Sequence, residues 1–256
     1  MESSNVLLKD SDGSSSFRLT AKYGVLAVVV MYAAQLIAGT GVSFLLKPLL
    51  QDDSGTVDIQ IIGLMSILIA GALVLSVFWL HYRREGHALL EEVSFKPSEM
   101  PRGQGLRLVI TVLVLTHLFA WIYRSVFLPE IGHGGVIGGG SQMFSYVSDT
   151  GSIPAMVAFL SLALFVGPAM EEVVFRGYLQ SSLSKTMPLW AALSVTSLVF
   201  MAGHSPIVLW PMYFVYSVSW GWVMVRTGSL KMAILIHVLS NLFYTIVGFA
   251  GWEILA

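Results

Sequence analysis

The stretch GPAMEEVVFR, at Gly167–Arg176, places two adjacent carboxylates and one arginine at the end of a long apolar run. Charge is scarce in this chain, since charged residues make up 11% of it and hydrophobic residues 55%. Ionisable side chains are costly at membrane depth, where they pair with one another or serve a function. The stretch therefore predicts a membrane helix with functional side chains at one end, and the rest of the chain is expected to supply their partners.

The composition favours a protein that is solvated by lipid. The mean hydropathy over 256 residues is +0.77, which is too apolar for an ordinary soluble domain. The formal net charge of -1 gives no field that would attract nucleic acid. The chain contains no cysteine, which excludes disulfides, thiolate metal ligands and a cysteine nucleophile.

Seven apolar runs approach the roughly 20 residues that a helix needs to cross a bilayer, although the fifth is short. The runs are Tyr23–Leu46, Ile59–Tyr82, Leu106–Leu128, Ile153–Met170, Leu189–Gly203, Ile207–Val225 and Met232–Gly251. We expect an all-α polytopic membrane protein with about seven (seven or eight) transmembrane helices in one bundle and an intramembrane site. The fourth helix should continue as a mixed helix to about Ser184.

Lysine and arginine gather in alternate loops, and this bias predicts the orientation in the membrane. Five of them lie between the end of the second span and the first turn of the third: Arg83, Arg84, Lys96, Arg102 and Arg107. By contrast, the glycine-rich loop Pro129–Ser152 contains neither residue type. We therefore expect the N-terminus in the cytoplasm and the C-terminus outside, with polar residues 1–22 forming a disordered cytoplasmic tail.

Glu171 and Glu172 are expected to differ in role. Glu172 and Arg176 are four residues apart on a helix and share a face, in the favoured acid-before-base order. Glu171 lies about 100° around the helix, so Arg176 can neutralise Glu172 and leave Glu171 free to act as a general base or acid. An ion pair where the helix leaves the membrane would give the same pattern. Pro168 removes a backbone hydrogen bond to Leu164 and predicts a kink one turn earlier.

Two further polar pairs lie in apolar surroundings. Phe200 and His204 are one turn apart, so the phenyl ring can brace the imidazole. His237 and Asn241 project side by side from the last span, where they could join two helices or bind a carbonyl or an oxyanion.

Residue counting leaves the depth of these groups open. Glu171 precedes Met187 by 16 residues and His204 follows it by 17, so a hairpin about that turn brings both to one level. That level is about 24 Å from the turn at 1.5 Å per residue. His237 follows Lys231 by only six residues, so it should lie near the cytoplasmic face. It meets the other groups only if spans four and five project beyond the bilayer or are strongly tilted.

Other chemistries can be compared with general acid–base catalysis. Glu171, His204 and His237 could hold Zn²⁺ with an open position, although there is no His-Glu-x-x-His motif. No serine lies in a Gly-x-Ser-x-Gly motif, so the sequence gives little support to the hypothesis of serine catalysis.

Three motifs in order carry a family resemblance: EEVVFR at 171–176, FMAGH at 200–204 and HVLSN at 237–241. Together with VRTGSL at 225–230 they resemble the CPBP family, the CAAX prenyl protease and bacteriocin-processing family of intramembrane proteases. The resemblance covers about residues 153–245.

The resemblance implies a helical site inside the bilayer that opens toward the cytoplasm. Glu171 and His204 would activate the water that attacks a peptide carbonyl. His237 and Asn241 would stabilise the oxyanion, with Phe200 as a support.

It also implies that Glu172 and Arg176 organise the site. The family has been described both as metalloproteases and as glutamate-dependent proteases, so no cofactor is certain and Zn²⁺ stays an option. No motif position departs from the family pattern.

We therefore expect an intramembrane endopeptidase, integral to a bacterial or archaeal cell membrane. Its partners would be the bilayer and a membrane-associated protein or peptide, of CAAX type or of leader or bacteriocin type, and not nucleic acid. After the tail, residues 23–152 would form N-terminal helices and loops, and residues 153–251 the catalytic core of a single membrane domain.

Two rival functions remain. One is a non-proteolytic membrane protein for peptide binding or immunity. The other is a proton-coupled transporter, which would be expected to show related halves or paired broken helices. No such repeat is apparent in the sequence.

Overall fold

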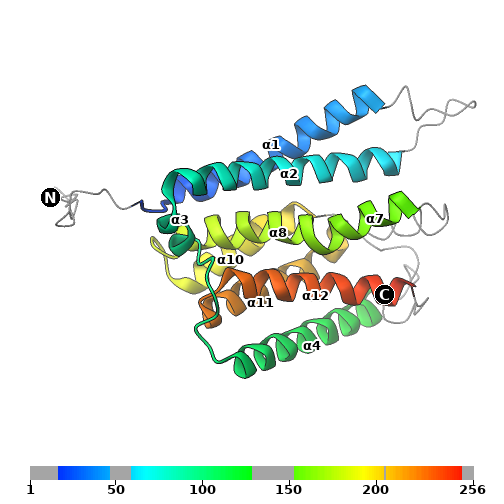
Figure 1. The fold of residues 1–256 in the computed structure, drawn as a ribbon. Coiled ribbons are helices and arrows are strands. Elements are labelled where there is room, and N and C mark those ends of the chain that lie inside the picture. Colours follow the sequence, from blue (N-terminus) through cyan, green and yellow to red (C-terminus); the bar gives the residue numbers. More distant parts are fainter. Residues whose placement is uncertain (1–16, 47–58, 129–152, 205, 250–256) are drawn as a thin grey trace, which may run out of the picture.

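The computed structural model describes residues 17–46, 59–128, 153–204 and 206–249, and every regular element within them is helical (Figure 1). The first half contains α1 (Ala21–Leu46), α2 (Ile59–Glu85), α3 (His87–Glu92) and α4 (Arg102–Phe127). The second half contains α7 (Ile153–Ser161), η2 (Leu162–Val166), α8 (Gly167–Glu172), η3 (Val173–Gln180), α9 (Ser181–Leu183), α10 (Leu189–Ala202), η4 (Ile207–Leu209), α11 (Trp210–Thr227) and α12 (Leu230–Phe249).

Within the described residues, six helices are long and apolar enough to cross a membrane. They are Ala21–Leu45, Ile62–Glu85, Arg102–Phe127, Met156–Leu183, Ile207–Thr227 and Leu230–Val247. The fifth predicted span corresponds to α10, whose 14 residues reach about 21 Å, short of a hydrocarbon core of about 30 Å. The prediction of an all-α polytopic membrane protein is confirmed.

One continuous helix from Ile153 to Leu183 runs through the middle of the bundle, and it ends close to the predicted Ser184. It packs against α1, α2, α10, α11 and α12. Two of its segments, η2 and η3, are π-helical, a wider form that is rare and frequently lies at functional sites. All eight residues of η3 are buried, which makes this segment the centre of the protein.

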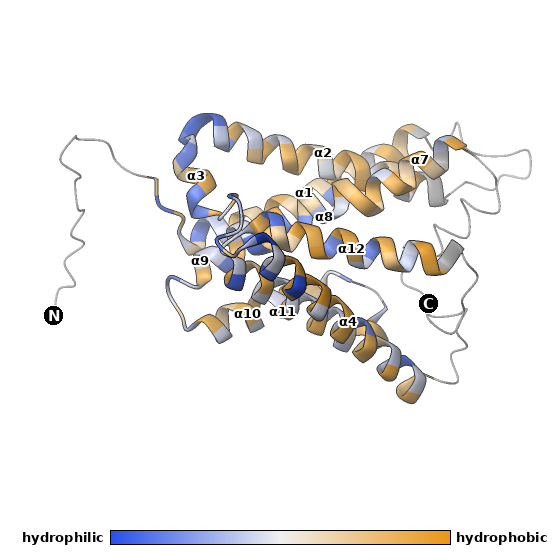
Figure 2. Cartoon of the chain, turned by 60° about the horizontal axis from the view of Figure 1, so that its bottom comes forward, coloured by the Kyte–Doolittle hydropathy of each residue, from blue (hydrophilic) through white to orange (hydrophobic). Residues whose placement is uncertain are grey.

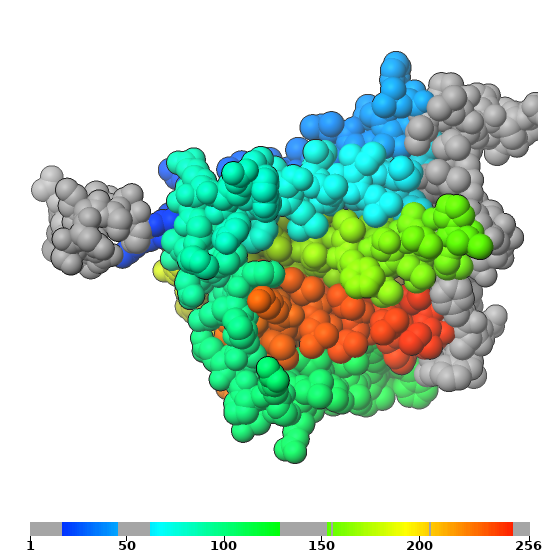
Figure 3. Space-filling model, in the orientation of Figure 1, coloured from blue at the N-terminus to red at the C-terminus, as the bar shows by residue number. Residues whose placement is uncertain are grey.

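The other helices form layers around this central helix. On one face α2, the α7–α8 segment, α12 and α4 lie side by side in that order (Figures 1 and 3). Large apolar side chains such as Leu36, Phe44 and Phe127 point outward from the bundle. Apolar residues cover most of the helix surfaces, and hydrophilic residues gather at the end with α3 and α9 (Figure 2). This distribution suits a protein whose sides face lipid.

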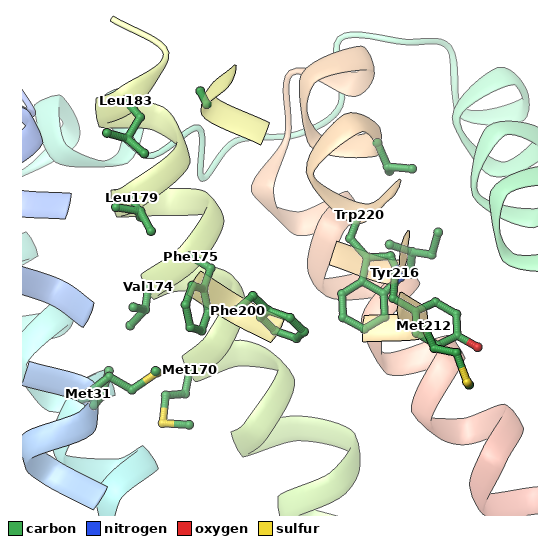
Figure 4. Close-up of a cluster of buried hydrophobic side chains, with 14 of the residues drawn as sticks. Met31, Met170, Val174, Phe175, Leu179, Leu183, Phe200, Met212, Tyr216 and Trp220 are labelled. Carbon is green, nitrogen blue, oxygen red and sulfur yellow. The ribbon is translucent and has the colours of Figure 1, made fainter. Parts of the chain in front are cut away.

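Aromatic rings pack among aliphatic side chains and methionines in the core beside the central helix (Figure 4). The rings of Phe175 and Phe200 meet edge to face at 5.1 Å, and those of Phe200 and Trp220 at 6.0 Å. Met31 of α1 and Met170 of α8 belong to the same buried cluster. Phe200 is 2% exposed, and its packing fixes the end of α10.

The predicted disordered tail needs a correction. Residues 1–16 lie outside the described residues, but residues 17–20 pack on the bundle and α1 already begins at Ala21. Leu19 is 1% exposed because its apolar side chain packs with Leu89 and Val93. Its backbone N–H also donates to Glu92 Oε2 at 2.9 Å. The loop Pro129–Ser152 lies outside the described residues.

Glycine allows α1 to approach the central helix closely. A Cβ on Gly24 would collide with the Ser182 side chain and lie 3.0 Å from Leu179 Cα and 3.1 Å from Tyr178 O. Gly39, on the same helix, has nothing within 4 Å of the equivalent position. Small residues at such crossings let membrane helices pack tightly.

We predict that Gly24→Leu destabilises the protein by about 1–3 kcal/mol, since the contacted atoms include backbone. This should lower the Tm in detergent by roughly 2–4 °C per kcal/mol. Gly39→Leu is the matched control and should leave the Tm near that of the wild type. Equal melting of the two variants would show that α1 does not depend on this close contact.

Candidate active site

Three separate helices bring predicted side chains to one carboxylate. Glu171 and Glu172 end α8, His204 follows the end of α10, and His237 lies in α12. Glu171 Oε2 lies 4.0 Å from His204 Nε2 and 3.9 Å from His237 Nε2. The structure thus joins residues that are 33 and 66 positions apart in the sequence.

The α11–α12 turn explains how His237 reaches the level of Glu171. A Cβ on Gly177 would lie 3.1 Å from the Leu230 side chain, so the first residue of α12 is level with Gly177. His237 is seven residues from Leu230, and Glu171 is six residues from Gly177. The two side chains therefore lie at similar depths along their helices. The turn that follows α9 therefore projects beyond the α11–α12 turn, one of the two arrangements that residue counting allowed.

The segment between α3 and α4 covers this recessed turn. Glu99 N donates to Thr227 O at 2.9 Å, and Leu230 N donates to Ser94 O at 2.8 Å. Gly228 allows the turn because its φ of 62° is in the left-handed region. The start of α12 is thus fixed by main-chain hydrogen bonds.

Glu172 and Arg176 form a fully buried ion pair, as their spacing predicts. Arg176 Nη1 lies 2.9 Å from Glu172 Oε1, and both side chains are 0% exposed. Arg176 Nη2 also donates to Ser217 O and Oγ, at 3.0 and 2.9 Å. The guanidinium lies 4.8 Å from the Phe200 ring centroid and 5.5 Å from that of Trp220. A charge buried this deeply persists only when it is paired and hydrogen-bonded.

His237 is held by the same carboxylate. Its Nδ1 lies 2.9 Å from Glu172 Oε1, and its ring stacks on Trp220 with centroids 4.0 Å apart. Because a carboxylate accepts, we assign the proton to Nδ1. In the neutral ring, Nε2 then presents a lone pair to Glu171.

His204 has an equivalent arrangement. Its Nδ1 lies 2.7 Å from Phe200 O, so we assign the Nδ1 proton as the donor to this carbonyl. Its ring stacks on Phe200 with centroids 4.3 Å apart, which is the bracing that the sequence predicts. Trp210 Nε1 donates to His204 O at 2.8 Å and fixes the backbone from the other side.

The separations of the three groups are ones that a single bridging water can span. Distances of 3.9 and 4.0 Å from Glu171 Oε2 to the two Nε2 atoms are too long for direct hydrogen bonds, and polar groups at such distances are commonly bridged by water. Glu171 is 21% exposed and His204 is 28% exposed, so the space can be reached from outside.

Asn241 has a contact that the sequence did not predict. Its Nδ2 donates to Ala163 O at 2.7 Å. In η2 the N–H of Gly167 donates to Leu162 O, in the π register. The next donor, for Ala163 O, would be Pro168, which has no N–H. Asn241 therefore satisfies a carbonyl that Pro168 leaves unpaired, and the lost bond is at Ala163 rather than at the predicted Leu164.

Sequence reasoning missed the contribution of α11. Tyr213, Ser217 and Trp220 contact His204, Arg176 and His237 in turn. Their spacing of four and three residues places them on one helix face. That periodicity was the available signal, but it is hidden among the other apolar and aromatic residues of this helix.

A metal site is not formed by these side chains as they are placed. Among the described residues, no three His, Asp or Glu side chains are grouped so that they could hold a metal ion. Two ligands of a tetrahedral Zn²⁺ with bonds of about 2.0–2.2 Å would lie about 3.4 Å apart. The separations of 3.9 and 4.0 Å around Glu171 are wider.

Comparisons with known proteins single out the same part of the chain. Residues 153–243 match the family model described as Type II CAAX prenyl endopeptidase Rce1-like. Over 100 residues the chain is 32% identical to the membrane-embedded CAAX protease MroQ of Staphylococcus aureus (strain USA300), covering 37% of this chain and 39% of that protein. No solved structure matches. The resemblance to the CPBP family is thereby confirmed for the region that carries the motifs.

The buried ion pair leads to a stability prediction. Arg176→Met leaves the Glu172 carboxylate buried without its cation, which should cost about 3–5 kcal/mol. Adding Glu172→Gln should restore part of the loss. The Tm and the folded yield in detergent measure both effects.

Lys185→Met is the control, because the Lys185–Glu92 pair is partly exposed and should contribute only about 0–1 kcal/mol. If Arg176→Met and Lys185→Met had equal effects, burial would not be what makes the Glu172–Arg176 pair important.

The contact of Asn241 predicts coupling with Pro168. Asn241→Leu should destabilise the protein by about 1–3 kcal/mol, since Ala163 O loses its donor. In a Pro168→Ala background the new N–H can reach this carbonyl, so the same substitution should cost less. Thermal melts of the two single variants and the double variant measure this difference, and additive effects would contradict the proposed role of Asn241.

Proposed function

We propose that the chain is an intramembrane endopeptidase that hydrolyses a peptide bond in a membrane-associated protein or peptide. The observation that carries the proposal is the position of Glu171 Oε2, which two imidazole Nε2 atoms approach at 3.9 and 4.0 Å. A water in this space would lie within hydrogen-bond reach of a carboxylate and an imidazole, as general-base catalysis requires.

In the proposed reaction Glu171 and His204 activate the water. Its oxygen forms a bond to the substrate carbonyl carbon, its proton passes to Glu171, and the carbonyl electrons move onto oxygen. The intermediate then collapses, the C–N bond breaks, and the proton passes to the leaving amine. No redox partner is needed.

Charge balance gives His237 a second role. Glu171, Glu172 and Arg176 sum to -1 when both imidazoles are neutral. Protonation of His237 would bring the sum to zero, and Glu172 Oε1 at 2.9 Å would stabilise the imidazolium. The charged ring would then present Nε2–H to an oxyanion, together with the second amide N–H of Asn241.

The surroundings of the site favour a substrate that arrives through the membrane. Ala202 and Gly203, beside His204, are exposed, and Ile207 is 70% exposed. A substrate would therefore meet an apolar surface next to the reacting groups. Support for the CAAX or peptide-processing class comes from the match of residues 153–243.

The test is peptide cleavage by the purified full chain in liposomes. Quenched fluorescent peptides ending in Cys-aliphatic-aliphatic-X, with and without a farnesyl group, would be compared with leader-type peptides. We expect Glu171→Ala and His204→Ala each to lower kcat by about 10²–10⁴-fold, as expected for loss of an acid–base group. Glu91→Ala is the matched control, because this glutamate side chain is 71% exposed and outside the site.

Each outcome has a distinct meaning. Full activity of both site variants would overturn the proposed mechanism. A cellular phenotype that survives Glu171→Ala would favour the peptide-binding or immunity function. Loss of activity with a chelator and its recovery with Zn²⁺ would show that the groups close around a metal in the working enzyme.

A further inference from the structure

Tyr32 of α1 reaches the site from a part of the chain that the family match does not include. A Cβ on Gly203 would collide with the Tyr32 hydroxyl and lie 3.1 Å from its Cζ. Gly203 directly precedes His204. The phenol therefore lies over the backbone that presents one of the two imidazoles.

Its neighbours place Tyr32 near the reacting carboxylate as well. The preceding residue, Met31, packs in the same cluster as Met170, which directly precedes Glu171 (Figure 4). α1 therefore packs along the central helix that carries Glu171, while its Tyr32 hydroxyl meets the backbone beside His204.

The site has many acceptors and few available donors. Glu171 accepts, and His204 presents a lone pair at Nε2. The donors proposed above for the oxyanion are the Nε2–H of protonated His237 and the second N–H of Asn241. His237 Nδ1 is used by Glu172, and one N–H of Asn241 is used by Ala163 O. By contrast, the structure gives the Tyr32 hydroxyl no hydrogen bond to any described residue. An oxyanion needs donors that are already in place when charge develops on it.

We infer that Tyr32 is a further catalytic residue, whose hydroxyl donates a hydrogen bond to the carbonyl oxygen of the scissile peptide bond. This inference rests on the proposed peptidase function. As water adds to the carbonyl carbon, the oxygen gains negative charge and the hydrogen bond from Tyr32 strengthens. The hydroxyl keeps its proton throughout.

The first test compares Tyr32→Phe with Tyr23→Phe, a control on the same helix whose ring stacks on His81 away from the site. Tyr32→Phe should lower kcat by about 10²-fold or more, the usual cost of one oxyanion donor. KM and the Tm should stay near the wild-type values, and Tyr23→Phe should keep full activity. A purely structural Tyr32 would instead lower the Tm.

A second test moves the hydroxyl without removing it. Gly203→Ala introduces the Cβ that collides with the end of the tyrosine side chain, which can swing away. This variant should lose kcat as Tyr32→Phe does. In the Tyr32→Phe background it should cost little more, because the two changes remove the same hydrogen bond.

The outcomes separate this inference from the proposed function. If Glu171→Ala is inactive while Tyr32→Phe keeps the wild-type kcat, the role of Tyr32 is overturned and the peptidase stands. Additive losses from Gly203→Ala and Tyr32→Phe would also overturn it. If Glu171→Ala remains active, the peptidase mechanism itself is wrong.

Discussion

The buried ion pair between Glu172 and Arg176 is the constraint on which the rest of the structure depends. Two charges without exposure in an apolar bundle are stable only if each finds further partners. Arg176 reaches Ser217 on α11, and Glu172 Oε1 also lies 2.9 Å from His237 on α12. Through these contacts one pair on the central helix fixes α11 and α12 around it.

The same pair also separates the roles of two neighbouring carboxylates. Glu172 is buried and its Oε1 is bonded to Arg176 and His237, whereas Glu171 turns toward His204 and His237 at 4.0 and 3.9 Å. The π-helical segments before and after α8 lie where this separation is made. There Asn241 supplies the donor that Pro168 lacks, so a polar side chain of α12 stabilises an irregular part of the central helix.

The N-terminal part of the chain completes a site that the matched region begins. Residues 153–243 carry the three motifs, but Ser94 and the segment after it cover the α11–α12 turn and set the depth of His237. From α1, Gly24 allows close packing on the central helix and Tyr32 reaches Gly203. α1 and the segment after α3 therefore support the helices that carry the candidate site.

The sequence by itself determined the all-α membrane architecture, the Glu172–Arg176 pair and the bracing of His204 by Phe200. These follow from hydropathy and from spacings of four residues on one helix, which are local properties. Only the tertiary structure decided that His237 is level with Glu171, that Asn241 bonds Ala163 O, that Tyr32 meets Gly203, and that Ser217 and Trp220 contact Arg176 and His237. Those contacts depend on where one helix begins relative to another, and a turn such as Gly228-Ser229 is placed by hydrogen bonds to residues more than 100 positions away.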